Sequence, residues 1–444
     1  MIVCTCSHKP GRNGQSAHYR VPIACNRGEV VTVDDRATNE PSTPRPASTG
    51  PLQGLRVIEM GQLVAGPFCG QILGDLGAEV IKLEQPGTGD PLREWGRTRP
   101  QGESLWWSVV GRNKKSVTVN LRTPEGQGIA RTLISRSDIV VENFRPGTLE
   151  RWGLGYDTLA ADNPGLILAR VSGFGQTGPY SSRAGYGSIG EAMGGLRYVV
   201  GDPSTPPSRV GISIGDTLAA VFAAIGTLGA VYERTRSGRG QVVDSAIYEA
   251  VLGIMESIVP EWVISGYQRE RSGAILPNVA PSNVYPTADG GWVLIAANQN
   301  TVFARLAEAM GMPELATDPQ FSTHGARGER QEQLDAMVGK FTVQHDARAL
   351  EELLLAHSVP VGKIYRPEDM LGDEQFIARK SIITTPHPTL GEVPMQNTFP
   401  RLSRTDGSVR WPGPALSEHT DEVLTVVGEF TRDAIDAFRA DGII

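Results

Sequence analysis

Short apolar runs alternate with longer amphipathic stretches along the first half of the chain. Residues 55–59 predict a buried strand, 68–76 a helix and 78–84 a second strand. A strand, a helix and a strand within about 30 residues form a βαβ unit, whose strands pair in parallel through a right-handed crossover. The same alternation predicts strands at 116–120, 138–142, 166–171 and 241–244, and helices at 123–135, 217–232 and onward from 244 through 258. This pattern predicts a layered α/β domain.

The pattern changes near residue 285. A hairpin is expected from 283–286 and 291–297, around a turn at Asp289-Gly290. Apolar positions then recur three and four residues apart, which predicts amphipathic helices. These helices are expected at 300–311, 330–342, 347–357 and, ended by Gly442, at 431–440. The second half of the chain therefore indicates a smaller, separate lobe.

The first 50 residues differ from the rest. Segment 39–51 is rich in Pro, Ser and Thr, and nothing before it shows a helical or strand period. We expect a disordered or extended N-terminal arm, which is not a secretory signal because it lacks a continuous apolar region. Cys4 and Cys6 lie near His8, but one intervening residue does not suit zinc and no second ligand pair follows. No metal site is expected.

Composition narrows the class of protein. The 444 residues carry 42 Lys and Arg against 49 Asp and Glu, a net charge of −7 without a basic stripe, which argues against nucleic acid as a partner. The longest apolar stretch, 218–232, is shorter than the roughly 20 residues that span a bilayer, so a soluble protein without a membrane partner is expected. Only Cys69 of the four cysteines lies in the body of the chain, so no disulfide framework is possible and a cytoplasmic location is expected.

A dinucleotide site is the first hypothesis that an α/β start invites. Glu84 ends the second predicted strand, where an acid that binds ribose would lie. Gly173, Gly175 and Gly178 have the spacing of the phosphate-binding turn, but Pro179 and polar residues follow in place of a helix. The glycine-rich phosphate loop of NTPases is also missing. The sequence therefore disfavours nicotinamide and flavin cofactors.

Histidine and carboxylate positions limit the possible chemistry. No histidine occurs between His18 and His324, so the α/β lobe contains no histidine base or metal ligand. Asp216 follows a glycine-flanked stretch and precedes the long apolar helix, where the helix dipole favours an ionised carboxylate. This aspartate is either a carboxylate nucleophile or a plain helix N-cap.

Six motifs, in order, carry a resemblance. They are VAGPFCGQILGDLGAEVIKLEQPGTGD, RNKKSVTVNLRTPEG, VVENFRPGTLERWGLGY, RVSGFGQTGPY, GISIGD and RSGRGQVVDSAIYEA. From about residue 52 to about residue 424 the chain resembles the class III coenzyme A transferases. That family includes formyl-CoA transferase and carnitine CoA-transferase, and it also contains the α-methylacyl-CoA racemases.

The resemblance implies an architecture. It is an α/β fold with a Rossmann-like parallel-sheet large domain and a smaller α+β domain. The large domain is expected at 51–265, the small domain at 275–375, and a C-terminal segment that returns to the large domain at 385–444. Two chains of this family thread through one another, so an interlocked homodimer is expected.

The resemblance also implies a mechanism. Asp216 aligns with the aspartate that attacks the donor thioester, forms a mixed anhydride and then an aspartyl-CoA thioester, which the acceptor carboxylate cleaves. Racemases pair this aspartate with a histidine, and Tyr186 stands at that position here. Gly187 replaces an acidic residue that many relatives carry. Glu191, four residues on, is either a partial substitute in catalysis or a solvated helix residue.

Contacts to CoA follow from the same motifs. The expected binding residues are Gln62, Val64, Ala65, Arg122, Asn143 and Arg151. Val64 replaces a glutamine of formyl-CoA transferase, so oxalate and formate are not expected as substrates. The stretch around Glu191 is closest to members that use succinyl-CoA with a dicarboxylic acceptor. The resemblance thus predicts CoA transfer from an acyl-CoA to a small carboxylic acid; the alternatives are a 2-methylacyl-CoA racemase and a CoA-binding protein without catalysis.

Overall fold

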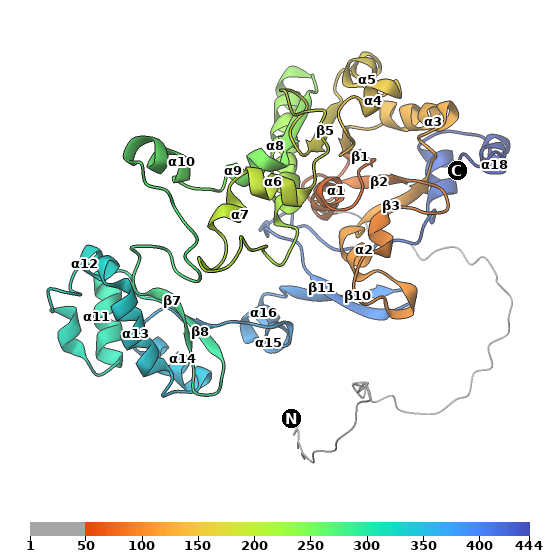
Figure 1. Cartoon of the computed structure of the whole chain (residues 1–444). Coiled ribbons are helices and arrows are strands. Elements are labelled where there is room, and N and C mark those ends of the chain that lie inside the picture. Colours follow the sequence, from red (N-terminus) through yellow and green to blue (C-terminus); the bar gives the residue numbers. More distant parts are fainter. Residues whose placement is uncertain (1–48) are drawn as a thin grey trace, which may run out of the picture. The chain divides into compact units, whose positions relative to one another are not determined.

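The structure is a computed structural model that describes residues 49–444. The expected N-terminal arm and the Cys4, Cys6 and His8 group lie outside the described residues. Figure 1 shows the order of the elements along the chain.

A six-stranded parallel sheet forms the centre of the α/β part, in the order β3-β2-β1-β4-β5-β6. Its strands are β1 (Arg56–Glu59), β2 (Glu79–Glu84), β3 (Lys114–Thr118), β4 (Ile139–Glu142), β5 (Ile167–Ser172) and β6 (Val242–Ala246). The chain builds β1 to β3 outward in one direction and then returns to lay β4 beside β1. The carboxyl ends of β1 and β4 are therefore the switch point of the sheet, where α/β proteins place their ligands.

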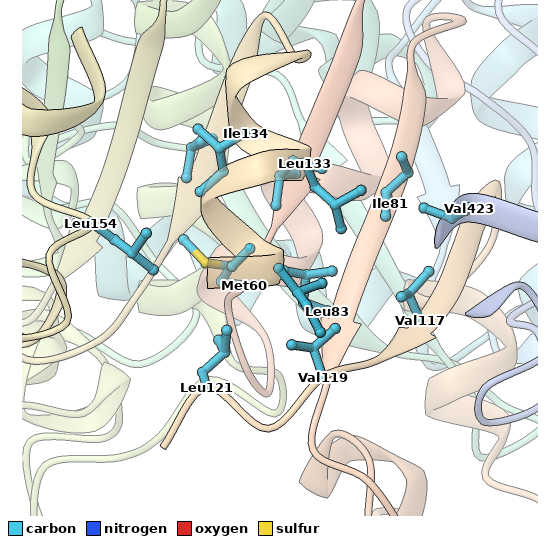
Figure 2. Packing of buried hydrophobic residues seen from close by; sticks show 14 of the residues in the cluster. Met60, Ile81, Leu83, Val117, Val119, Leu121, Leu133, Ile134, Leu154 and Val423 are labelled. Carbon is cyan, nitrogen blue, oxygen red and sulfur yellow. The ribbon is translucent and has the colours of Figure 1, made fainter. Parts of the chain in front are cut away.

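Strands β1, β2, β4 and β5 are buried on both faces, which explains their largely apolar sequences. On one face Ile58, Ile81 and Val140 pack with α3 (Pro124–Ser135), α17 (Thr420–Val426) and α18 (Arg432–Ala440), and Figure 2 shows part of this cluster. On the other face Val57 and Ile139 pack with α1 (Ala65–Asp75) and α8 (Ile214–Ser237). The alternation of neighbouring residues between the two clusters is the period of two that a strand requires.

Helix α8 is closely packed because its inner face consists of alanine. Ala219, Ala220, Ala223 and Ala224 are buried, and α8 contacts α1, β5 and β6. By length and composition alone α8 could cross a membrane, and it is longer than the predicted 217–232. Its alanine face nevertheless belongs to the core of the sheet, as in the core helix of an α/β domain.

A three-stranded antiparallel sheet forms the centre of the second half. It contains β7 (Ser282–Pro286), β8 (Trp292–Ala296) and β9 (Val361–Lys363), packed in one apolar cluster with α11 (Asn300–Ala309), α13 (Gln331–Thr342) and α14 (Ala347–Ala356). The predicted hairpin and helices are confirmed within one or two residues. A separate hairpin joins β10 (Ile382–His387) to β11 (Gly391–Gln396). The expected domain boundaries stay a prediction.

Short helices complete the described chain. They are α2 (Leu105–Val110), α4 (Thr148–Arg151), α5 (Tyr156–Asp162), α6 (Gly187–Met193), α7 (Leu196–Val199), α9 (Ile247–Leu252), α10 (Ile258–Pro260), α12 (His324–Glu329), α15 (Pro367–Gly372) and α16 (Glu374–Ala378). The prediction that the apolar helix after β6 extends through residue 258 was wrong. Helix α9 ends at Leu252, and Glu256 then takes a left-handed backbone, with φ 51°, which a continuous helix cannot contain.

Candidate active site

The loop that follows β1 lies at the switch point and is bonded to the residue that follows β4. We call residues 60–64 the β1–α1 loop. The Gln62 amide donates to Asn143 Oδ1 over 2.7 Å, and Asn143 Nδ2 donates to the Gln62 carbonyl over 2.9 Å. A β-carbon at Gly61 would lie 3.2 Å from Asn143 Oδ1, so glycine is needed for this approach. Two predicted binding residues, Gln62 and Asn143, thus meet.

A buried cluster of four charged side chains lies beneath this loop. Lys82 Nζ lies 2.9 Å from both Glu59 and Asp90, and Lys114 Nζ lies 2.7 Å from Glu59. All four side chains are at most 2% exposed, and their two positive and two negative charges balance. Burial opposes the charge on Lys82, but Asp90 and Glu59 outweigh it and raise the Lys82 pKa. Burial lowers the pKa of Lys114, and the Glu59 charge offsets this only in part.

The buried cluster holds the backbone of the loop. Lys82 donates to the Gly61 carbonyl (2.5 Å), Lys114 to the Pro67 carbonyl (2.6 Å), and Asp90 accepts from the Leu63 amide (3.0 Å). Leu63 has φ 64°, a left-handed conformation that costs a non-glycine residue about 1 kcal/mol or more. The loop therefore has one imposed conformation before any ligand binds. Sequence reasoning missed this cluster, although Lys82 within the apolar run of β2 was a signal.

Glu84 is not available for a ribose. Its carboxylate is buried and accepts from Arg93 (2.8 Å), from the Ser116 hydroxyl (2.7 Å) and from the Asp90 amide (2.9 Å). Burial alone would raise the Glu84 pKa, but the Arg93 guanidinium outweighs it and lowers the pKa. The Glu84 carboxylate is already occupied, so it is not free to bind a ribose hydroxyl.

Asp216 lies in the first turn of α8, next to α6. The interpretation of Asp216 as the N-cap was wrong, since Ser213 is the N-cap and Asp216 is the third helical residue. Gly215 allows the approach of the two helices, because a β-carbon there would lie 2.9 Å from the Gly187 carbonyl oxygen. A β-carbon at Gly187 would in turn lie 2.4 Å from Asp216 Oδ2. The space that a side chain at position 187 would need is filled by the Asp216 carboxylate.

The surroundings of Asp216 disfavour its charge. Among residues 49–444 no donor hydrogen-bonds to this partly buried carboxylate. Burial and then the negative charge of Glu191 raise the Asp216 pKa to about 6, while the positive charge of Arg209 opposes them. The carboxylate is thus ionised at neutral pH but poorly stabilised, which favours a nucleophile over a structural cap.

Glu191 and Tyr186 differ in their exposure to solvent. Glu191 is 1% exposed; its carboxylate accepts from Arg197 Nε over 2.6 Å and from the Gly215 amide over 3.4 Å. The reading of Glu191 as a solvated helix residue was wrong. Tyr186 is 68% exposed at the N-cap of α6, and its hydroxyl forms no hydrogen bond with Asp216.

A cavity of about 1050 Å³ connects the starts of α1 and α8. Val64 and Phe68 line it from the side of α1, and Ser213 and Thr217, which flank Asp216 in the chain, line it from α8. Apolar side chains form most of the remaining wall, among them Leu105, Trp106, Ile225 and Phe399. Asp216 does not itself line this space, but Ser213 and Thr217 of the same helix start do, so a space large enough for part of a substrate begins beside it.

The two predicted arginines lie on the surface. Arg122 is exposed in the turn between β3 and α3. Arg151 ends α4, a few residues after Asn143 in the chain. Its guanidinium donates to the Thr148 hydroxyl over 3.0 Å and lies close to Gly147. In the described part of the chain neither guanidinium forms an ion pair, so both are free to meet phosphate.

Fold and site together define a class of enzyme. Three features are typical of an α/β enzyme that binds its substrate at the carboxyl edge of the strands. They are the order of the strands, the β1–α1 loop fixed at the switch point, and a carboxylate with a raised pKa beside a cavity. Residues 52–420 match the model for CoA-transferase family III. The chain belongs to this family and is an enzyme of the CoA-transferase type. The expected family, enzyme class and α/β fold are confirmed.

Several known proteins are similar to this chain over nearly its whole length. A succinyl-CoA–D-citramalate CoA-transferase of Chloroflexus aurantiacus is 58% identical over 394 residues, 89% of this chain and 98% of that protein. The alpha subunit of a succinyl-CoA–L-malate CoA-transferase of the same organism is 42% identical over 89% of this chain and 92% of that protein. The crystal structure of a CAIB/BAIF family protein from Brucella suis superposes with a TM-score of 0.76 at 35% identity, covering 85% of this chain and all of that chain.

Proposed function

We propose that this enzyme transfers CoA from succinyl-CoA to a hydroxylated dicarboxylic acid of four or five carbons, such as citramalate. The similarity to the citramalate enzyme over 89% of the chain supports the substrate class. The observation that carries the mechanism is the Asp216 carboxylate, which is ionised at neutral pH, unbonded within residues 49–444 and adjacent to the cavity.

The reaction proceeds through acylation of Asp216. Its carboxylate attacks the thioester carbon, the C–S bond breaks, and the CoA thiolate leaves with the electron pair. The thiolate then attacks the aspartyl carbonyl of the mixed anhydride, which releases the donor as succinate and leaves an aspartyl-CoA thioester. The acceptor carboxylate attacks this thioester and forms a second anhydride, from which the thiolate takes the acceptor acyl group. Asp216 is regenerated, so atoms and charge balance over the cycle.

The remaining predicted residues take supporting roles in this proposal. Glu191 keeps the Asp216 pKa high and ties the start of α8 to α6, and Tyr186 stays exposed at the start of α6. Gln62, Val64 and Ala65 contact the pantetheine arm, and Asn143 holds their loop. Arg122 and Arg151 bind the phosphates of the nucleotide end. The expected absence of a metal, nicotinamide or flavin cofactor and the cytoplasmic location stay predictions.

Substitution of Asp216 tests the mechanism. We expect Asp216→Ala to lose exchange between succinyl-CoA and citramalate while it keeps its fold and its affinity for CoA. Asp157→Asn is the control, because it removes an exposed carboxylate in the first turn of α5. Hydroxylamine added to the wild-type enzyme with succinyl-CoA should leave a hydroxamate on Asp216, detected by peptide mass spectrometry. Turnover by Asp216→Ala, or a hydroxamate elsewhere, would overturn the mechanism.

The same assay separates the alternatives. A racemase needs two bases on opposite faces of Cα, and Tyr186 points to solvent in place of the second. Incorporation of deuterium at Cα of a 2-methylacyl-CoA without thioester exchange would therefore replace our proposal by racemisation. A binding protein without catalysis would show neither reaction.

We further propose a homodimer. Apolar side chains form an exposed stripe on α8, with Phe222 at 39%, Ile225 at 57% and Tyr232 at 68% exposure, and Ile264 near α10 is 84% exposed. Apolar surface gathered in this way is typical of an interface. Light scattering after gel filtration should give twice the chain mass of 47.7 kDa. Ile264→Glu should lower that mass, because Ile264 is exposed and does not line the cavity, and a wild-type monomer would refute the dimer.

A further inference from the structure

This inference rests on the proposed function. Succinate, malate and citramalate each carry two carboxylates, and only one of them reacts at Asp216. The second carboxylate then stays negatively charged in a site that already holds two acidic side chains, Asp216 and Glu191. An anion brought into such surroundings needs a positive partner, because an unpaired charge away from water is strongly unfavourable. A guanidinium is well suited, since it binds a carboxylate through two parallel hydrogen bonds.

Two arginines lie near the start of α8, and one of them already forms an ion pair. Arg197 donates to Glu191 over 2.6 Å. Arg209 lies in the exposed segment before α8, and its Nη2 is 3.5 Å from the hydroxyl of the N-cap residue Ser213. Within residues 49–444 no carboxylate lies in ion-pair distance of Arg209.

The place of Arg209 matches the geometry that a second carboxylate requires. Ser213, which Arg209 contacts, lines the cavity and precedes Asp216 by three residues, so both lie on the same side of the first turn. The charge of Arg209 is felt at the Asp216 carboxylate, whose pKa it lowers. Gly211, between Arg209 and the helix, is exposed, and a β-carbon there would meet no atom within 4 Å, so this side of Arg209 is open to an approaching acid.

We infer that Arg209 binds the second, unreactive carboxylate of the dicarboxylic acids and thereby determines the specificity of the enzyme for them. The donor and the acceptor use the same guanidinium in turn, because each acid reacts at the same aspartate. Arg209 acts by positioning and takes no part in bond making.

The test compares acids that differ only in the second carboxylate. The dicarboxylic pair is succinyl-CoA with citramalate, and the matched pair is butyryl-CoA with 2-hydroxy-2-methylbutyrate. We expect Arg209→Met to lower kcat/KM for the dicarboxylic pair by roughly 10- to 100-fold, mainly through KM, as for loss of a charged hydrogen bond. The matched pair should change less than about twofold, and Arg209→Lys should restore part of the loss because it keeps the charge but not the bidentate geometry.

Controls keep the outcomes distinct. Arg239→Met removes an exposed arginine beyond the other end of α8 and should leave both pairs unchanged. If butyryl-CoA reacts too slowly, inhibition by free succinate and by butyrate gives the same comparison. In Arg209→Met the inhibition by succinate should become weaker, and the inhibition by butyrate should not change. Equal losses for both pairs, or no loss for either, would overturn the inference. Activity of Asp216→Ala would instead overturn the proposed mechanism, whatever Arg209→Met does.

Discussion

Protonation of Asp216 should set the activity of this enzyme at acid pH. Its surroundings raise the pKa from 3.8 to about 6, which corresponds to a penalty on the ionised form of about 3 kcal/mol. At pH 7 about nine-tenths of the carboxylate is ionised, and at pH 5 about one-tenth. Because only the ionised form attacks a thioester, kcat/KM should fall about tenfold as the pH drops from 7 to 5.

Glu191→Gln tests the cause of this shift. The change removes the negative charge that raises the Asp216 pKa and preserves the size of the side chain. Burial is the larger cause, so the acid limb should move to lower pH by about one unit or less. The variant should therefore retain more of its neutral-pH activity at pH 5 than the wild type does.

The assay is the pH profile of kcat/KM for succinyl-CoA between pH 4.5 and 8. Glu249→Gln serves as the matched control, because Glu249 on α9 bonds to Tyr248 and does not affect the Asp216 pKa. Its profile should coincide with that of the wild type. An acid limb near pH 4 in the wild type, or a limb that moves to higher pH in Glu191→Gln, would refute the reasoning.

Three further predictions concern the support of the site. Gly187→Ala should displace the Asp216 carboxylate, since its β-carbon would lie 2.4 Å from Oδ2; kcat should fall at least tenfold with an unchanged melting temperature. Lys114→Met should lower the free energy of unfolding by about 3–5 kcal/mol in urea, and the part-exposed neighbour Lys115→Met by under about 1 kcal/mol. Asn143→Ala should raise KM for the CoA thioester about tenfold with little change in kcat, because it frees the β1–α1 loop.

Most of the fold could be predicted from local patterns. The apolar runs that became β1, β2 and β4 are buried on both faces of a parallel sheet, and such strands carry a strong signal. The amphipathic helices of the second half were placed within two residues, because their apolar residues recur three and four positions apart. The helix after β6 was overextended, because apolar residues continue in the sequence to Ile258 although the helix ends at Leu252.

The sequence alone determined the enzyme family and the candidate site residues. A glycine-flanked aspartate before an apolar helix made Asp216 a candidate, and an ordered series of motifs led to the enzyme family and to the role proposed for Asp216. Such features are contiguous in the sequence, so no knowledge of the fold is needed to see them.

Tertiary structure decided how those residues work. Glu59 pairs with lysines 23 and 55 positions later, and Glu191 reaches the amide of Gly215, 24 residues away. These contacts depend on strand order and on helix packing, which no local pattern encodes. The raised pKa of Asp216 has the same origin, because burial and the field of distant charges exist only after the chain has folded.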